Sequence, residues 1–207
     1  MRREAKRTEG RVIGLYGGSF NPAHEGHLHV AKEALKRLKL DEIWFVVSPG
    51  NPLKGAVGMA PFSERMSSIS KLIGCRPNMT ATDIEQKLDT VYTATMVSEL
   101  KKALPKTKFI WVMGADNFVG FQHWKHWQNI VRMLPIAIFD RAGYAIDGLK
   151  SDLARYYHKF HVAPKQLKSA QTPAWTFVTI PRHPGSATEV RNQRETEWFM
   201  NQQGKET

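Results

Sequence analysis

A glycine pair followed by two closely spaced histidines is the part of the sequence best suited to chemistry. Residues 16–29 read Tyr-Gly-Gly-Ser-Phe-Asn-Pro-Ala-His-Glu-Gly-His-Leu-His. Gly17 and Gly18 let the backbone approach a ligand closely, and the helix that follows offers unpaired N–H groups and the positive end of a dipole. His24 and His27 are three residues apart, which places both imidazoles on one helical face. We predict a phosphate site suited to phosphoryl or nucleotidyl transfer; plain turn punctuation with solvent-facing histidines is the alternative.

The same string closely resembles a signature of a known superfamily. Nucleotidyltransferases that make dinucleotides and related cofactors carry Gly-Gly-Thr/Ser-Phe-Asp/Asn-Pro-x-His-x-Gly-His, and Asn21 here replaces the Asp of many members without its charge. Residues 186–191, Ser-Ala-Thr-Glu-Val-Arg, resemble the second superfamily signature, Ser-Ser/Ala-Thr-x-Ile-Arg. Hydroxyls and amides at a helix start can hold phosphate oxygens, and the Arg191 guanidinium can fork onto a leaving diphosphate. An ordinary helix cap with an exposed Arg191 is the alternative for this segment.

Shorter segments resemble the nicotinate mononucleotide adenylyltransferases within that superfamily. The loop Pro-Gly-Asn-Pro-Leu-Lys ends at Lys54, which can reach a phosphate, although such a lysine is usually just solvated. Tyr92 and Thr93 resemble the Ser-Tyr-Thr element of the family, and Trp124 matches a Trp that stacks on the nicotinate ring. Core packing is the alternative for Trp124 and the expected role of Trp127.

Two further groups of residues have both a functional and a structural interpretation. Asp116 follows a predicted strand in Gly-Ala-Asp, where it could contact a ribose or a metal-bound phosphate, or simply cap the next helix. The family pattern has Gly-x-Asp here, which favours the ligand role. His123 and His126 have a spacing that could ligate zinc, but no further His or Cys pair lies nearby, so no metal site is predicted.

The resemblance implies a role for each matching residue. The catalytic residues would be His24, His27 and Arg191. The residues that contact ATP and its phosphates would be Gly17, Gly18, Ser19, Phe20, Lys54, Gly114, Asp116, Ser186 and Thr188. The residues that contact nicotinate mononucleotide would be Asn51, Tyr92, Thr93 and Trp124. Mg²⁺ would enter with ATP and be held mainly by phosphates and water.

Apolar strands that alternate with amphipathic helices predict an α/β fold. The predicted strands are 11–16, 42–47, 79–84, 108–113, 134–139 and 175–180, and the predicted helices are 26–38, 62–73, 93–103, 124–133 and 147–158, with two more after Pro184. This order predicts a doubly wound, Rossmann-like parallel sheet with helices on both faces. Ligands bind beyond the carboxyl ends of such strands, so Gly17, the loop 48–61 and Gly114 should meet.

Composition limits the classes of protein that the chain could be. It has 207 residues and a formal net charge of +11, which attracts anions such as nucleotides or nucleic acids. Cys75 is the single cysteine, which suits the cytoplasm, and no apolar run approaches the roughly 18 residues of a membrane span. The first residues are rich in Arg and Lys. We predict a disordered basic tail over 1–10 and one nucleotidyltransferase domain over 11–207.

These features favour an enzyme similar to the nicotinate mononucleotide adenylyltransferases, with ATP and nicotinate mononucleotide as substrates. The alternatives are adenylation of nicotinamide mononucleotide or phosphopantetheine, cytidylyl transfer, or a non-catalytic nucleic-acid-binding domain. The even spread of Lys and Arg beyond the N-terminal cluster argues against nucleic acid as a partner. Residues 14–19 do not match Gly-x-Gly-x-x-Gly, which argues against an NAD-dependent oxidoreductase. No membrane partner is expected, and a homo-oligomer is left open.

Overall fold

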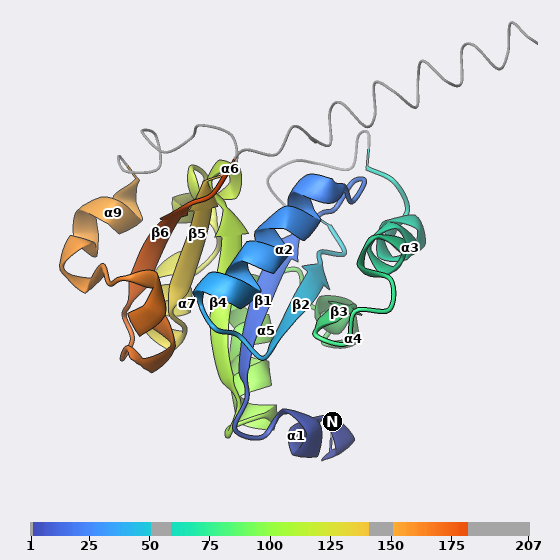
Figure 1. Cartoon of the computed structure of the whole chain (residues 1–207), viewed down its shortest axis with the longest axis horizontal. Helices are drawn as coiled ribbons and strands as arrows, with labels where there is room; N and C mark the ends of the chain where they lie inside the picture. Colours follow the sequence, from blue (N-terminus) through green and yellow to red (C-terminus); the bar gives the residue numbers. More distant parts are fainter. Residues whose placement is uncertain (1, 51–58, 141–150, 182–207) are drawn as a thin grey trace, which may run out of the picture.

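The computed structural model describes residues 2–50, 59–140 and 151–181, and a parallel sheet forms its centre. Within these residues six strands lie in the order β3-β2-β1-β4-β5-β6, and every neighbouring pair is parallel (Figure 1). This order confirms the predicted doubly wound sheet, in which the chain changes direction between β1 and β4. The strands are β1 (Val12–Gly18), β2 (Glu42–Val47), β3 (Met79–Thr82), β4 (Lys108–Gly114), β5 (Ile136–Asp140) and β6 (Trp175–Thr179).

Helices and short 3-10 turns connect the strands. The described α-helices are α1 (Arg2–Thr8), α2 (Glu25–Arg37), α3 (Phe62–Ile73), α4 (Ile84–Lys87), α5 (Thr93–Ala103), α6 (Ala115–Phe118), α7 (Trp127–Met133) and α9 (Asp152–Tyr156). The 3-10 turns are η1 (Phe121–His123), η2 (His158–Phe160) and η3 (Pro164–Ser169). None of the helices in these ranges is long and apolar enough to cross a membrane.

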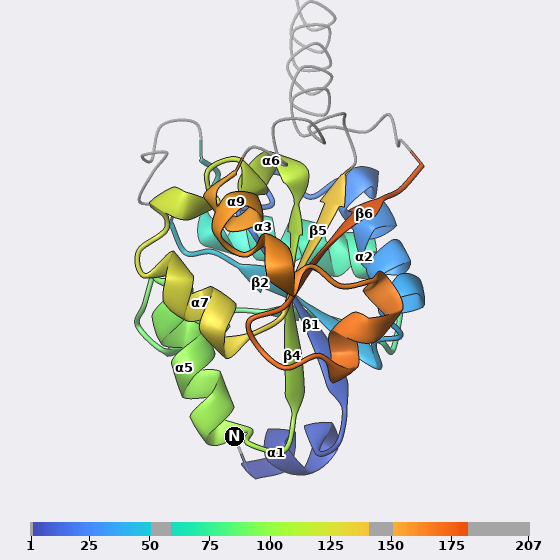
Figure 2. The same ribbon diagram turned by 90° about the vertical axis from the view of Figure 1, so that its left-hand side faces the viewer.

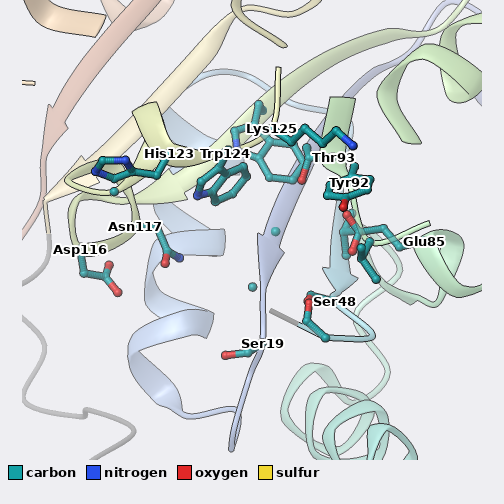
Figure 3. A pocket seen from close by; sticks show the side chains of 17 residues that line it. Ser19, Ser48, Glu85, Tyr92, Thr93, Asp116, Asn117, His123, Trp124 and Lys125 are labelled. Carbon is teal, nitrogen blue, oxygen red and sulfur yellow. The ribbon is translucent and has the colours of Figure 1, made fainter. Parts of the chain in front are cut away.

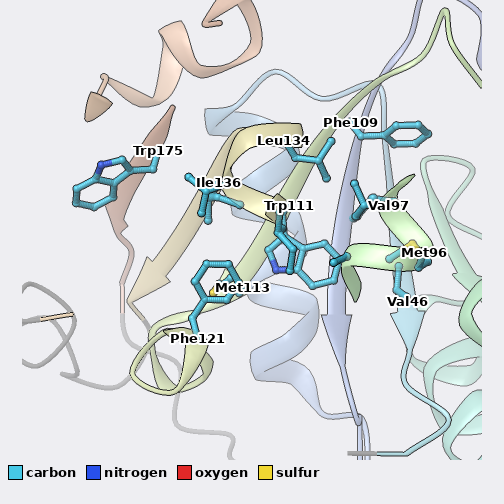
Figure 4. Packing of buried hydrophobic residues seen from close by; sticks show 14 of the residues in the cluster. Val46, Met96, Val97, Phe109, Trp111, Met113, Phe121, Leu134, Ile136 and Trp175 are labelled. Atoms are coloured by element: carbon cyan, nitrogen blue, oxygen red, sulfur yellow. The ribbon is translucent and has the colours of Figure 1, made fainter. Parts of the chain in front are cut away.

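The helices cover both faces of the sheet, which creates two apolar layers. Figure 2 shows α5 and α7 on one side of the sheet and α2 on the other. Successive residues of β4 alternate between the layers: Trp111 belongs to the same core cluster as Val97 of α5, whereas Val112 belongs to the same core cluster as Leu28 of α2 (Figure 4 shows the α5 side). The strands are therefore buried on both faces, as their nearly continuous apolar sequences predict.

Most predicted elements are present with small shifts. The strand 42–47 and the helices 62–73 and 93–103 have the predicted bounds. The predicted helix 124–133 begins only at Trp127, because the preceding residues form η1 and Trp124 has extended backbone angles. Of the predicted helix 147–158, residues 152–156 are helical, and 147–150 lie outside the described residues. The helices predicted after Pro184 also lie outside them.

Residues 2–8 form helix α1, where the sequence predicted a disordered tail. Arg7 pairs with Glu42 at 2.6 Å, and Arg11 approaches the same carboxylate at 3.3 Å. The Glu42 side chain is 1% exposed and also accepts hydrogen bonds from Thr80 and Trp44 Nε1. Burial alone would raise the pKa of Glu42, but Arg7 and the other donors hold it below its ordinary value. A buried carboxylate that needs a cation thus explains why this basic segment packs on the sheet.

Candidate active site

A cavity of about 340 Å³ opens beyond the carboxyl ends of β1, β2 and β4 (Figure 3). It lies where the strand order changes direction, the place at which doubly wound sheets bind ligands. Residues predicted to bind phosphate and residues predicted to bind the ring both line it. They are Gly17, Gly18, Ser19, Tyr92, Thr93, Asp116 and Trp124. The topology thus brings together segments that are about 100 positions apart in the sequence.

Gly17 is required by lack of space and not by unusual dihedral angles. Strand β1 continues through Gly17 and Gly18, past its predicted end at residue 16, and neither glycine has a positive φ. A Cβ atom at Gly17 would lie 2.4 Å from both Cη2 and Cζ2 of Trp111, whose side chain is 1% exposed. The indole of Trp111 therefore occupies the volume that any larger residue at position 17 would need.

The turn after β1 contains a residue in the left-handed region, but that residue is Phe20. Its φ is 48°, which is unfavourable for a bulky side chain. The ring is buried and makes edge contacts with Tyr16 and His27, with centroids 5.6 and 5.0 Å apart. The aromatic packing of Phe20 thus holds the turn in its strained form beside the start of α2.

The two predicted catalytic histidines lie together at the start of α2. His24 is the N-cap, His27 is the third helical residue, and their ring centroids are 3.8 Å apart. The backbone N–H of His24 donates to Nδ1 of His27 at 3.2 Å, which leaves the neutral His27 ring with its proton on Nε2. Both side chains are buried, and neither is among the residues that line the cavity. The pairing of the rings is as the spacing predicts, and their catalytic role stays a prediction.

A buried arginine joins the segments that follow β1 and β2. Arg65 of α3 donates from Nη1 to the carbonyl oxygens of Ser19 (2.8 Å) and Ser48 (2.7 Å). Its Nη2 donates to the carbonyl of Pro49 and its Nε to that of Ala60, both at 3.1 Å. Burial lowers the pKa of this guanidinium. Nothing in the sequence around Arg65 indicates this role, because an arginine in an amphipathic helix is usually on the exposed face.

Aromatic and basic side chains form one wall of the cavity. The Nζ atom of Lys125 lies 4.3 Å from the ring centroid of Tyr92, and both side chains face the cavity (Figure 3). Trp124 contacts Trp111 edge to face, with centroids 5.9 Å apart, and still lines the cavity. Trp124 therefore packs against the core and also faces the cavity, and its stacking on the nicotinate ring stays a prediction. Trp127 packs against the core, as predicted.

Glu85 is a buried carboxyl group on the same side of the cavity. Glu85 is 4% exposed. Its carboxyl group accepts a hydrogen bond from the side chain of Thr93, the first residue of α5. Burial raises the pKa of Glu85 to about 7, and the hydrogen bond from Thr93 opposes this only in part. The sequence does not indicate that Glu85 is buried, since its segment Ile-Glu-Gln-Lys resembles any exposed charged helix.

Asp116 lies on the opposite side of the cavity from Tyr92 and Glu85, next to Asn117 (Figure 3). Gly114 ends β4 and is itself the N-cap of α6, so Asp116 occupies the first turn of that helix and is not its cap. This placement favours the ligand role over the capping role. Among the described residues, no group of three His, Cys, Asp or Glu side chains could hold a metal ion.

Several predicted site residues lie outside the described part of the chain, and their roles stay predictions. They are Asn51, Lys54, Ser186, Thr188 and Arg191. The residues of the cavity and its support that the sequence did not assign include Ser48, Arg65, Glu85, Trp111, Asn117, His123 and Lys125.

The sheet order and the cavity at its switch point define a nucleotide-binding α/β protein of the nucleotidyltransferase type. The chain belongs to the cytidylyltransferase-like family, whose sequence model matches residues 15–193. It is 44% identical over 186 residues to a Rhizobium johnstonii protein named "Probable nicotinate-nucleotide adenylyltransferase", which covers 88% of this chain and 93% of the relative. A Ruegeria pomeroyi protein of the same name is 41% identical over 199 residues, or 95% and 92% of the two chains.

Solved structures show the same fold at lower identity. Plasmodium falciparum nicotinic acid mononucleotide adenylyltransferase complexed with NaAD superimposes with a TM-score of 0.67 and 20% identity, over 88% of this chain and 83% of that chain. The same Plasmodium falciparum enzyme complexed with APC gives a TM-score of 0.65 at 19% identity, with the same coverage. These structures support the fold, and the relatives named above support the family.

Proposed function

We propose that the protein is an enzyme that transfers the adenylyl group of ATP to nicotinate mononucleotide, which yields deamido-NAD and diphosphate. The observation that carries the proposal is the cavity at the switch point, where the segment Gly17–Ser19 meets the wall around Trp124. The names of the relatives, which are 41–44% identical over most of their length, agree with this activity.

In this reaction an oxygen of the mononucleotide phosphate attacks the α-phosphorus of ATP, a new P–O bond forms, and the bond to diphosphate breaks. The attacking phosphate is ionised near neutral pH, so the enzyme needs no general base. Catalysis then depends on alignment and on stabilisation of negative charge at the α-phosphoryl group. The site therefore requires hydrogen-bond donors and cations around the phosphates, placed by a rigidly held turn.

The described residues offer such donors. The Nε2–H of His27 and the backbone N–H groups at the start of α2 would stabilise the α-phosphoryl oxygens, with His24 beside them. Arg65 would hold the turn in place through the carbonyls of Ser19 and Ser48. Arg191 and Thr188 are proposed to bind the leaving diphosphate.

Mg²⁺ is proposed to accompany ATP, and when bound it would neutralise part of the phosphate charge. The side of the cavity with Asp116 offers one carboxylate toward it, which suits an ion held mainly by phosphate oxygens and water. A cytoplasmic location stays a prediction.

Product analysis tests the proposed function. The purified protein is incubated with Mg²⁺ and one nucleotide, ATP or CTP, together with nicotinate mononucleotide, nicotinamide mononucleotide or phosphopantetheine. We expect deamido-NAD and diphosphate in equal amounts from ATP and nicotinate mononucleotide. Products only from CTP or only from phosphopantetheine would assign the protein to another activity of the superfamily. No product from any pair would favour a non-catalytic binding domain.

A further inference from the structure

Glu85 is a buried acid in the cavity that the reaction described above does not use. It lies on α4, and its backbone carbonyl accepts a hydrogen bond from the N–H of Thr90 at 3.0 Å, which fixes the segment between α4 and α5. Its carboxyl group faces the cavity and accepts the hydroxyl hydrogen of Thr93. No salt bridge involves Glu85 within the part of the chain that the structure describes. A buried carboxyl without a cation is costly to ionise.

The other charged groups near this wall come from four segments. Asp83, the N-cap of α4, and Lys87 form an ion pair at 2.8 Å in which the Asp83 side chain is half-buried and the Lys87 side chain is exposed. Lys125 stands over the ring of Tyr92 at 4.3 Å, and His123 lines the cavity from η1. Asp116 of α6 lies on the opposite side (Figure 3). Glu85 therefore shares a wall of the cavity with Tyr92 and Thr93, two of the residues predicted to contact nicotinate mononucleotide.

We propose that Glu85 determines whether this cavity prefers a pyridine carboxylate or a pyridine carboxamide, through its hydrogen bond with Thr93. The inference rests on the proposed function, since it concerns the choice between nicotinate and nicotinamide mononucleotide. Protonated Glu85 donates its O–H to Thr93 Oγ1, and the Thr93 hydroxyl then turns its own hydrogen toward the ligand carboxylate. Ionised Glu85 accepts that hydrogen instead, so Thr93 presents only lone pairs, which suit the NH₂ group of an amide.

The ionised form also adds a negative charge that repels the ligand carboxylate. Both effects act in the same direction. Nicotinate mononucleotide therefore binds better when Glu85 is protonated, whereas nicotinamide mononucleotide does not require that proton. The pKa of about 7 places this change within the range in which the enzyme can be assayed. By linkage, the preference for nicotinate mononucleotide should be highest below the pKa of Glu85 and should fall as the pH rises through it.

The ratio of kcat/KM for nicotinate mononucleotide to kcat/KM for nicotinamide mononucleotide, measured from pH 6 to pH 9, tests the proposal. Both substrates carry the same phosphate, so its titration cancels in the ratio. We expect the ratio of the native enzyme to fall on the order of tenfold across this range. A ratio that stays constant while deamido-NAD is still formed would overturn the role of Glu85 and leave the proposed function intact. No dinucleotide from either substrate would overturn both.

Matched variants locate the effect at Glu85. Glu85→Gln keeps the size of the side chain and offers N–H donors to Thr93, so its ratio should stay near the low-pH value at every pH. Asp83→Asn makes the same chemical change two residues away, in the ion pair with Lys87 and outside the cavity lining, and it should follow the native profile. A Glu85→Gln variant that keeps the native pH dependence would contradict the proposal. If this variant fails to fold, the profile of the native enzyme alone decides the question.

Discussion

Gly17→Ala is expected to destabilise the protein, because Trp111 occupies the space beside the α-carbon of Gly17. The added Cβ would lie 2.4 Å from two ring carbons, about 1 Å closer than ordinary van der Waals contact. The indole is 1% exposed and belongs to the core cluster that includes residues of β4 and α5, so displacing it would disturb the packing of that cluster. Overpacking of this kind costs about 1–3 kcal/mol, and we expect about 2 kcal/mol.

Thermal unfolding followed by circular dichroism measures this loss. For a chain of this length, about 2 kcal/mol corresponds to a decrease in Tm of roughly 4–8 °C. Gly120→Ala is the matched control, because a Cβ there meets no atom within 4 Å and φ is −100°. We expect the free energy of unfolding of Gly120→Ala to lie within about 0.5 kcal/mol of that of the native protein. Equal Tm values for the two variants would refute the steric argument.

A double variant identifies the clashing partner. Trp111→Leu alone should destabilise by leaving a cavity of several carbon atoms in the core. In the Trp111→Leu background, Gly17→Ala should cost much less than it does beside Trp111, since the ring carbons that it would meet are gone. Simple additivity of the two changes would show that the strain at position 17 comes from another neighbour.

Further predictions concern single side chains of the site. His27→Ala should lower kcat by about 100–1000-fold while the Tm shows that the variant is folded, and a loss below tenfold would contradict its proposed role. Arg191→Lys should raise the KM for ATP, because an ammonium cannot fork onto diphosphate; unchanged ATP kinetics would make Arg191 a surface charge. Arg65→Lys should lower the free energy of unfolding in urea by at least about 2 kcal/mol, since one ammonium cannot serve carbonyls of four residues, and a smaller loss would show that those carbonyls are held by other contacts. The folded state holds the proton of Glu85 up to about pH 7, against 4.5 ordinarily, so the native protein loses stability between these values as the pH rises. The free energy of unfolding of Glu85→Gln should therefore exceed that of the native protein by up to about 3 kcal/mol at pH 8 but by little at pH 4.5. An equal difference at both pH values would contradict the burial of the Glu85 charge.

The sequence predicted the sheet and the placement of the main site segments for identifiable reasons. Buried parallel strands leave long apolar runs, such as residues 42–47, and the motif that contains His24 and His27 is specific in residue order. The topology rule for parallel sheets then placed the segments after β1 and β4 beside each other, and the cavity lies there.

Features that depend on contacts between distant residues could not be predicted in this way. The need for glycine at position 17 comes from Trp111, which lies 94 positions later, and it has no local signature. Glu85 and Arg65 have ordinary helical neighbours in the sequence, and only the packed chain shows that both are buried. The basic N-terminal segment likewise packs on the sheet through the ion pair of Arg7 with Glu42, which lies 35 positions later in the chain.

The central claim is that the cavity at the switch point holds the pyridine ring against Trp124 while the reaction proceeds. Steady-state kinetics of Trp124→Leu test it most directly, with Trp127→Leu as the control that changes a neighbouring core tryptophan. We expect Trp124→Leu to raise the KM for nicotinate mononucleotide by roughly tenfold or more, the usual value of one aromatic stack, with little change in the KM for ATP. Trp127→Leu should lower the stability of the protein and should have a smaller effect on the KM for either substrate. Equal changes in both KM values, or a change for ATP alone, would contradict the account.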